Sequence, residues 1–253
     1  MNIESAYNDY LVHLESKRKR TKEKFHASSS GSCFRKQMYS YFDFPQSVKD
    51  KRSYRLLRLG TIIHEDIENA IMHSSNSIDG RVYIENEIEI PEFNLVGTYD
   101  LGQLVEEKDG SKTFNLYDIK SSAMFTWQKM FGHIKNRKPG SDNNYKMQLA
   151  TYALAVNEEL EPDKLNMYLV WYKKNDSYWR EVPVSPDWIE KAIDYWTELN
   201  GILEDCGESF EEELKPGYWH GVPFNTEWEC SYCPYYDICP STFGKKKWGN
   251  NEK

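Results

Sequence analysis

The chain has 253 residues, of which 39% are hydrophobic, with a formal net charge of −8 and an isoelectric point near 5.4. This composition can fill a sizeable core, and the simplest organisation is one compact domain with a terminal lobe. The charge argues against a protein that coats nucleic acid through bulk attraction, but it leaves room for a local basic groove. No apolar run approaches the roughly 20 residues that cross a bilayer, and the polar start lacks a secretory signal. We therefore expect a cytoplasmic protein with no membrane contact.

The first part of the chain is predicted to be helical over residues 3–24. A small, polar loop at residues 27–32 then delivers Cys33 to a second helical stretch. Residues 55–72 place apolar side chains at spacings of three and four, which predicts a helix with His64 beside its apolar stripe. The stripe consists of Leu56, Leu59, Ile63, Ile67 and Ile71.

The middle and later parts of the chain alternate strand-like and helix-like segments. Strands are predicted at residues 82–90, 95–105, 113–119, 165–172 and 178–184, and helices at residues 145–156 and from Pro186 to about residue 203. The turn at residues 106–110 makes the second and third strands a hairpin, and residues 135–144 are expected to form an exposed loop. This order predicts an α/β fold whose mixed central sheet is flanked by helices.

Two carboxylates and one ammonium fall at the functional edge of this predicted sheet. Asp100 ends its strand, and Asp118 and Lys120 are two residues apart on the next, so that both point to the same face. Phosphodiester hydrolysis needs carboxylates that hold Mg²⁺ or Mn²⁺ and a lysine that positions the attacking water. A D-x-K triplet also occurs by chance as an exposed ion pair, but its place one hairpin strand after Asp100 and one helix after His64 makes this one more specific.

His64, Gln148 and Tyr152 are further candidates for this site. An imidazole beside two carboxylates suits Mn²⁺ as well as Mg²⁺, although an isolated helix histidine is more often capped by water or a carboxylate. Gly60, four residues earlier, would let the helix approach the sheet closely. Gln148 and Tyr152 share a helix face, where they either face the metal centre and scissile phosphate or form a buried polar pair.

Four cysteines lie in two distant places. Cys33 is near the start, and Cys230, Cys233 and Cys239 form a C-x2-C-x5-C group near the end. Five cysteines in a reducing compartment favour ligation over disulfides, and the rivals are a [4Fe-4S] cluster, a four-thiolate zinc site and unligated thiols. One remote ligand joined to a group of three, with prolines after two of them, favours the cluster. Cys206 fits no ligand pattern.

These motifs together resemble a known family. The series G-x-x-x-H (60–64), G-T-Y-D (97–100), D-I-K (118–120) and Q-x-x-x-Y (148–152) is similar to the RecB-like branch of the PD-(D/E)XK nuclease superfamily. With the four cysteines, the chain resembles the iron-sulfur members of that branch, which include the CRISPR-associated Cas-four nucleases, AddB-type subunits and stand-alone viral relatives. The resemblance extends over about residues 29–240.

The resemblance implies a role for each motif residue. Its metal ligands would be His64, Asp100, Asp118 and the Ile119 carbonyl, binding Mg²⁺ or Mn²⁺. The catalytic group would consist of Lys120, Asp118 and Asp100 with Gln148 and Tyr152 as accessories, and Cys33, Cys230, Cys233 and Cys239 would bind [4Fe-4S]. The implied organisation is an N-terminal helical segment at 1–50 that contributes Cys33, a nuclease core at 51–203 and a cluster-binding segment at 204–253. Asp118 stands where glutamate is common, which shortens the reach of that ligand.

The implied function is a metal-dependent DNA exonuclease that prefers single strands or free ends, degrades 5′ to 3′ and has some endonuclease activity. The alternatives are a DNA-end binding or adaptor subunit of a recombination, repair or CRISPR adaptation complex, with protein partners, and a zinc-stabilised scaffold. No Walker motif is present, which argues against an ATPase in this chain.

Aromatic and basic residues between the D-I-K motif and the next helix are candidates for a strand path. We expect Phe125 and Phe131 to pack in the core and Trp127 to lie on the surface. The remaining candidates are Tyr145, Lys129, Lys135, Arg137 and Lys138.

Overall fold

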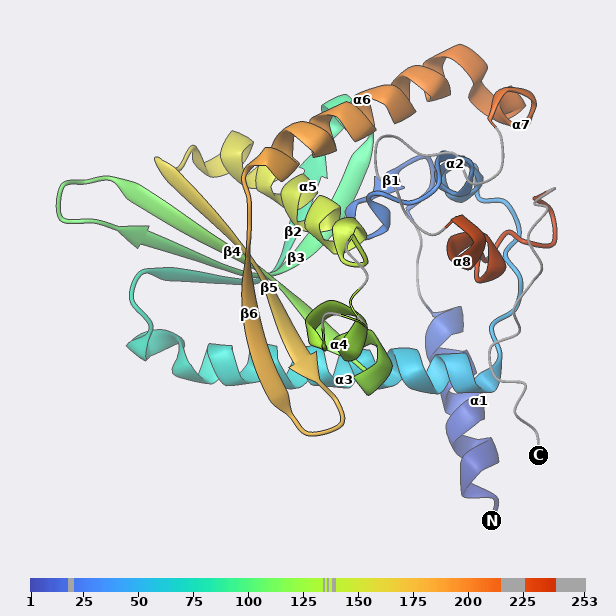
Figure 1. Cartoon of the computed structure of the whole chain (residues 1–253), viewed down its shortest axis with the longest axis horizontal. Coiled ribbons are helices and arrows are strands. Elements are labelled where there is room, and N and C mark those ends of the chain that lie inside the picture. Colours follow the sequence, from blue (N-terminus) through green and yellow to red (C-terminus); the bar gives the residue numbers. More distant parts are fainter. Residues whose placement is uncertain (18–20, 134, 136, 138–139, 215–225, 240–253) are drawn as a thin grey trace.

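The computed structural model describes residues 1–17, 21–133, 135, 137, 140–214 and 226–239. Within these ranges the chain forms an α/β fold with one mixed sheet, as the sequence predicts, flanked by helices (Figure 1). The strands are β1 (Phe25–His26), β2 (Arg81–Ile90), β3 (Leu95–Glu106), β4 (Lys112–Ser122), β5 (Lys164–Lys173) and β6 (Tyr178–Val184). The helices are α1 (Ile3–Ser16), α2 (Phe34–Tyr41), α3 (Lys51–Ser74), α4 (Met124–Phe131), α5 (Asn143–Leu160), α6 (Asp187–Cys206), α7 (Phe210–Glu213) and α8 (Thr226–Ser231).

Strand β3 organises the sheet. The main path runs β1-β3-β4-β5-β6, and β2 pairs with the other edge of β3. The β4–β5 pair is parallel, which requires a crossover, and α5 lies in that connection. The short β1 pairs in parallel with Leu95 and Val96, at the end of β3 that β4 does not reach.

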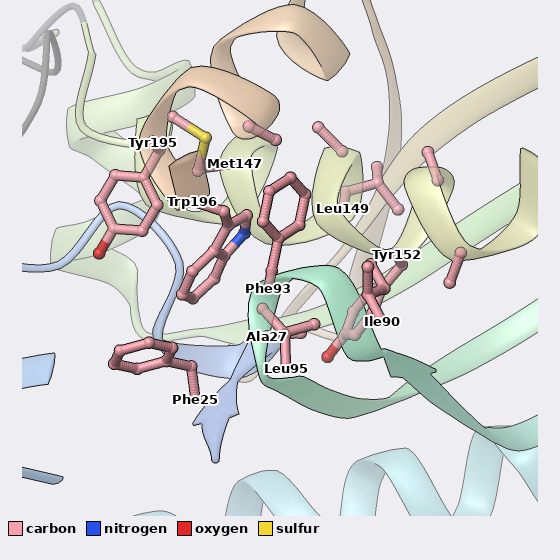
Figure 2. Close-up of a cluster of buried hydrophobic side chains, with 14 of the residues drawn as sticks. Phe25, Ala27, Ile90, Phe93, Leu95, Met147, Leu149, Tyr152, Tyr195 and Trp196 are labelled. Carbon is pink, nitrogen blue, oxygen red and sulfur yellow. The ribbon is translucent and has the colours of Figure 1, made fainter. Parts of the chain in front are cut away.

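The helices cover the two faces of the sheet unequally. Helices α5 and α6 lie on one side, and α3 crosses the other (Figure 1). The core is densest under α5 and α6, where Phe25, Tyr152, Tyr195 and Trp196 interlock with residues of η3 (Pro91–Phe93) and β3 (Figure 2). A buried side-chain hydrogen bond also joins α5 to α6, in which Trp196 Nε1 donates to Thr151 Oγ1 at 2.9 Å.

Helix α3 differs from the amphipathic helix that its apolar stripe suggests. Asp50 caps it by accepting a hydrogen bond from the Ser53 amide, and the helix extends beyond both predicted ends. Its buried residues are Ser53 and Glu68, whereas Leu56 and Leu59 are exposed. Ile63, Ile67 and Ile71 of the stripe are half-buried, so the most covered side chain of α3 near the predicted site is an acid, Glu68.

Two local predictions were wrong, and two short elements were not predicted. The first helix ends at Ser16, so the predicted helix over residues 3–24 is too long, and residues 18–20 lie outside the described ranges. Strand β1, with two residues, and helix α4, with eight, were missed because such short segments show no clear periodicity. Helix α5 begins at Asn143, inside the predicted loop.

The N-terminal and C-terminal segments meet beside α2. The Ser47 amide donates to the Pro234 carbonyl at 2.7 Å, and Gln46 Nε2 donates to the Tyr235 hydroxyl at 2.7 Å. The Tyr235 ring also stacks on Tyr39 of α2, with centroids 5.2 Å apart. Residues nearly 200 positions apart in the chain are thus held side by side.

In the described part of the chain, no helix combines the length and apolarity that crossing a bilayer requires.

The packing at Gly97 yields a prediction about stability. A Cβ at this position would lie 2.7 Å from the Ala27 Cβ and 3.0 Å from the Tyr152 ring, so Gly97→Ala should destabilise the protein by about 1–3 kcal/mol through overpacking. Gly201 in α6 has open space around it, and Gly201→Ala should instead stabilise by about 0.5–1 kcal/mol. Thermal unfolding of the two variants should give shifts of opposite sign. Equal shifts would contradict the packing described for Gly97.

Candidate active site

The predicted site residues gather where β3 and β4 separate. The two strands pair from Glu106 and Lys112 as far as Leu101 and Tyr117, and the next residue on each strand is an aspartate, Asp100 or Asp118. Beyond that point Asp100 Oδ2 accepts a hydrogen bond from the Ile119 amide at 2.6 Å. The side chain of Asp100 therefore bridges two strands whose backbones have stopped pairing.

Helix α3 adds two ligand-type side chains to this opening. His64, Glu68 and Asp100 each offer one nitrogen or oxygen atom, and these atoms all lie within 4.8 Å of one another. His64 Nδ1 is 3.7 Å from Asp100 Oδ2. Glu68 was missed in the sequence analysis, although its spacing of four from His64 places both on one helix face.

Burial disfavours the ionised form of the acids at this opening. Burial raises the pKa of Glu68 to about 8, assisted by the neighbouring carboxylates of Glu85 and Asp100. Burial also raises the pKa of Asp100 to about 6, against the opposing effects of Lys120 and the Ile119 amide. The pKa of His64 is lowered by burial and by the Lys120 charge, which keeps the imidazole neutral. A neutral imidazole is the form that can bind a metal.

Lys120 is held on the α5 side of the opening. Its Nζ donates to Asp118 Oδ1 at 2.9 Å and to Gln148 Oε1 at 3.0 Å, and it lies 5.1 Å from the centroid of the Tyr145 ring. Gln148 in turn donates from Nε2 to the Tyr152 hydroxyl at 2.8 Å. The structure thus brings Asp118, Lys120, Gln148 and Tyr152 into one hydrogen-bonded chain, and Tyr145 is an addition that the sequence analysis placed elsewhere.

Two carboxylate oxygens in the site accept no hydrogen bond. Asp118 is fully buried, and its Oδ2 is 2.7 Å from Lys120 Nζ without hydrogen-bond alignment. Glu68 Oε1 is likewise buried and unbonded. Burial raises the pKa of Asp118 to about 7, although Lys120 opposes the shift. Unsatisfied buried oxygens beside a neutral imidazole form a donor set that fits a hard divalent cation such as Mg²⁺ or Mn²⁺.

The four predicted cluster ligands line a second pocket. Cys33, at the start of α2, faces Cys230, Cys233 and Cys239, and Arg35 and Lys36 also line this pocket. The Cys33 amide donates to Glu229 Oε1 at 3.0 Å, which ties the two segments beside the thiols. Burial raises the pKa of the Cys233 thiol to about 11. Cys206 lies at the end of α6 and does not line this pocket.

The predictions about the aromatic residues after β4 were partly wrong. Trp127, predicted to lie on the surface, is 8% exposed, because Phe131 and Tyr178 pack against its ring. Phe125, predicted to lie in the core, is 68% exposed. Helix α4 has only eight residues, and the elements that pack against it decide which of its faces is covered. The sequence of the helix does not reveal that face. Lys138 lies outside the described residues.

One of three comparisons with known proteins identifies a family. The family model of the PD-(D/E)XK nuclease superfamily matches residues 46–240. Among solved structures, the crystal structure of SSO0001 is 17% identical over 94% of this chain and 96% of its own, with a TM-score of 0.47. A structure from Eubacterium rectale described as a "Putative exonuclease" is 16% identical over 55% of this chain and 47% of its own, with a TM-score of 0.30. Among curated proteins, no match was found.

The charge at Glu68 yields a prediction about pH. Below its ordinary pKa of 4.5 the side chain is protonated in both the folded and the unfolded protein, so it has no effect on stability. As the pH rises towards 8, the unfolded chain loses the proton and the folded chain keeps it, which progressively penalises folding. Glu68→Gln should therefore match the wild type near pH 4 and exceed its metal-free stability by about 1–2 kcal/mol at pH 8. Urea unfolding in the presence of a chelator measures this difference, and a difference that does not change with pH would contradict it.

Glu65→Gln is the matched control, since Glu65 is exposed on the same helix and pairs with Arg58 at 2.9 Å. Added Mn²⁺ should raise the melting temperature of the wild type and of Glu65→Gln, and raise that of Glu68→Gln much less. Equal stabilisation of all three proteins would remove Glu68 from the metal site.

Proposed function

Because the chain belongs to the PD-(D/E)XK nuclease superfamily, we propose that it is a metal-dependent DNA exonuclease whose active centre is the opening between β3 and β4. The superfamily makes it a nuclease, a hydrolase with a nucleic acid substrate. The observation that carries the finer proposal is the pair of buried carboxylates, Asp118 and Glu68, that each keep an oxygen without a hydrogen bond near the buried Lys120, because a protein that only binds DNA has no need of them.

In this proposal His64, Asp100, Asp118 and the Ile119 carbonyl hold Mg²⁺ or Mn²⁺, with Glu68 as a further carboxylate at the same opening. A bound divalent cation lowers the pKa of a water molecule and offsets negative charge on the phosphate. The raised pKa values of Asp100, Asp118 and Glu68 support this assignment, since a cation would favour the ionised form of all three.

The side chains around Lys120 fix its ammonium in place. Burial disfavours the charge, but the Asp118 and Asp100 carboxylates outweigh burial and raise the Lys120 pKa, so the side chain stays protonated. Gln148 and the Tyr145 ring restrict its position from the α5 side. A fixed cation next to the carboxylates can orient the attacking water and stabilise charge that develops on the phosphate oxygens. Tyr152 acts indirectly, by orienting the Gln148 amide.

The substrate proposed is DNA, as single strands or free ends, degraded 5′ to 3′ with some endonuclease activity. This part rests on the motif resemblance and on the acidic charge of the protein, which allows binding only where local lysines and arginines offset the repulsion. Protein partners from a recombination, repair or CRISPR adaptation complex would fit the same activity, as would a cytoplasmic location in which the thiols stay reduced.

We also propose that Cys33, Cys230, Cys233 and Cys239 hold a [4Fe-4S] cluster that clamps the two ends of the nuclease core. Their shared pocket supports this assignment. One remote thiolate joined to a group of three is the sequence pattern that favours a cluster over zinc.

The active-centre proposal predicts the loss of cleavage in two variants. Lys120→Ala and Asp118→Asn should each reduce degradation of end-labelled single-stranded DNA with Mg²⁺ or Mn²⁺ by about 100-fold or more, because each removes a charge that acts on the phosphate. Lys164→Ala, at the far end of β5, should cleave normally. Full activity of Asp118→Asn would contradict the proposed centre. A wild type that binds DNA ends without cutting them would favour the adaptor alternative.

The cluster proposal predicts the colour of the protein. Anaerobically purified protein should be brown and contain about four irons per chain, and Cys33→Ala should be colourless and less soluble. Cys206→Ala should keep the colour. Colourless wild-type protein that contains zinc would contradict the cluster.

A further inference from the structure

Lys174 is a half-buried cation beside the proposed active centre that the motif analysis did not include. Lys174 directly follows β5. Its amide donates at 2.9 Å to the carbonyl of Ser122, a residue of β4 that lies two positions after Lys120. In the parallel β4–β5 pair Lys120 lies opposite Trp171 and Ser122 opposite Lys173, so Lys174 follows the end of β5 that lies beside Lys120. No carboxylate among the described residues pairs with it, and burial alone lowers its pKa.

Neighbouring cations differ from Lys174 in having partners. Lys173 pairs with Asp176 at 2.7 Å, and the Arg180 guanidinium lies 4.6 Å from the Phe131 ring centroid. A partly buried ammonium without an anionic partner is costly unless a ligand supplies the negative charge. Its position next to a centre that handles phosphodiesters makes a phosphate the fitting ligand.

Helix α4 carries an exposed aromatic ring and begins beside the residue that follows Lys174. The Met124 amide, at the start of α4, donates at 2.7 Å to Oδ1 of Asn175, the residue after Lys174. The adjacent Phe125 is 68% exposed, and the Lys129 ammonium lies 4.3 Å from its ring centroid. Trp127 of the same helix is buried and packs its ring against Tyr178 of β6. Phe125 is thus an exposed, flat apolar ring with the Lys129 ammonium beside it, on a helix that contacts β6 and the residue after Lys174.

We infer that Lys174 and Phe125 form the path of a single DNA strand at the active centre, in which Lys174 binds a backbone phosphate and Phe125 stacks on a base. This inference rests on the proposed nuclease function. A single strand fits better than a duplex, because stacking on a side chain needs a base whose face is free. The positive charges of Lys174 and Lys129 complement the strand in a protein whose net charge is −8.

The test is strand binding measured separately from cleavage. Fluorescence anisotropy of labelled oligo(dT), with the metal-free Asp118→Asn protein as the parent, gives the dissociation constant as a function of salt. Adding Lys174→Ala should raise it about three- to tenfold at about 0.1 M salt and reduce the slope of log K against log salt by about 0.7, the loss of one phosphate contact. Lys174→Arg should restore the affinity. Adding Phe125→Ala should weaken binding about fivefold or more without changing the slope, because stacking releases no counterions.

Lys164→Ala in the same parent is the control, since it removes one exposed lysine from the opposite end of β5. If Lys174→Ala matches Lys164→Ala in affinity and slope, Lys174 binds no phosphate. If Phe125→Ala weakens the binding of blunt duplex as much as that of oligo(dT), Phe125 does not stack on a base. Either result overturns the inferred path. Cleavage by the wild type with Mn²⁺ is measured in parallel, so failure of the nuclease proposal would appear there, independently of strand binding.

Discussion

The separation of β3 and β4 is the constraint on which the site depends. The strands pair up to Leu101 and Tyr117 and then part, and the Asp100 side chain bonds to the Ile119 amide across the opening. Because β3 no longer covers this edge of β4, carboxylates from both strands and side chains from α3 can meet in the space between them. Strand β1 pairs with β3 beyond the opening and so covers the edge that β4 leaves.

The same opening buries a carboxylate that needs a counterion. Asp118 is fully buried, and Lys120 is its counterion. Lys120 is oriented by Gln148, Gln148 by the Tyr152 hydroxyl, and the Tyr152 ring fits where Gly97 lacks a side chain. The glycine of the G-T-Y-D motif and the tyrosine of the Q-x-x-x-Y motif are therefore coupled by packing. Buried acids with raised pKa values reduce stability at neutral pH, which is a typical cost of a preformed site for a cation.

The sequence predicted the parts of this protein that depend on periodicity and ordered motifs. The strands at residues 82–90, 95–105 and 113–119, which form the sheet around Asp100 and Asp118, could be predicted because side chains alternate between the two faces of a strand in a short, regular period. It could not reveal where β3 and β4 stop pairing, since that depends on tertiary packing. Glu68 was missed because a glutamate on a helix is ordinarily solvated, and only the fold shows that this one is buried. Phe125 was predicted to be buried and Trp127 to be exposed, and the structure shows the reverse. The sequence could not show this, because Trp127 of α4 packs against Tyr178, which is distant in the chain.

The most direct test of the central claim is an anomalous diffraction map of crystals soaked in Mn²⁺, because it locates the cation without relying on activity. The account predicts one strong peak in the opening between β3 and β4, enclosed by His64, Asp100, Asp118 and the Ile119 carbonyl. An opening without a peak at saturating Mn²⁺, or a peak only at a distant surface carboxylate, would contradict it.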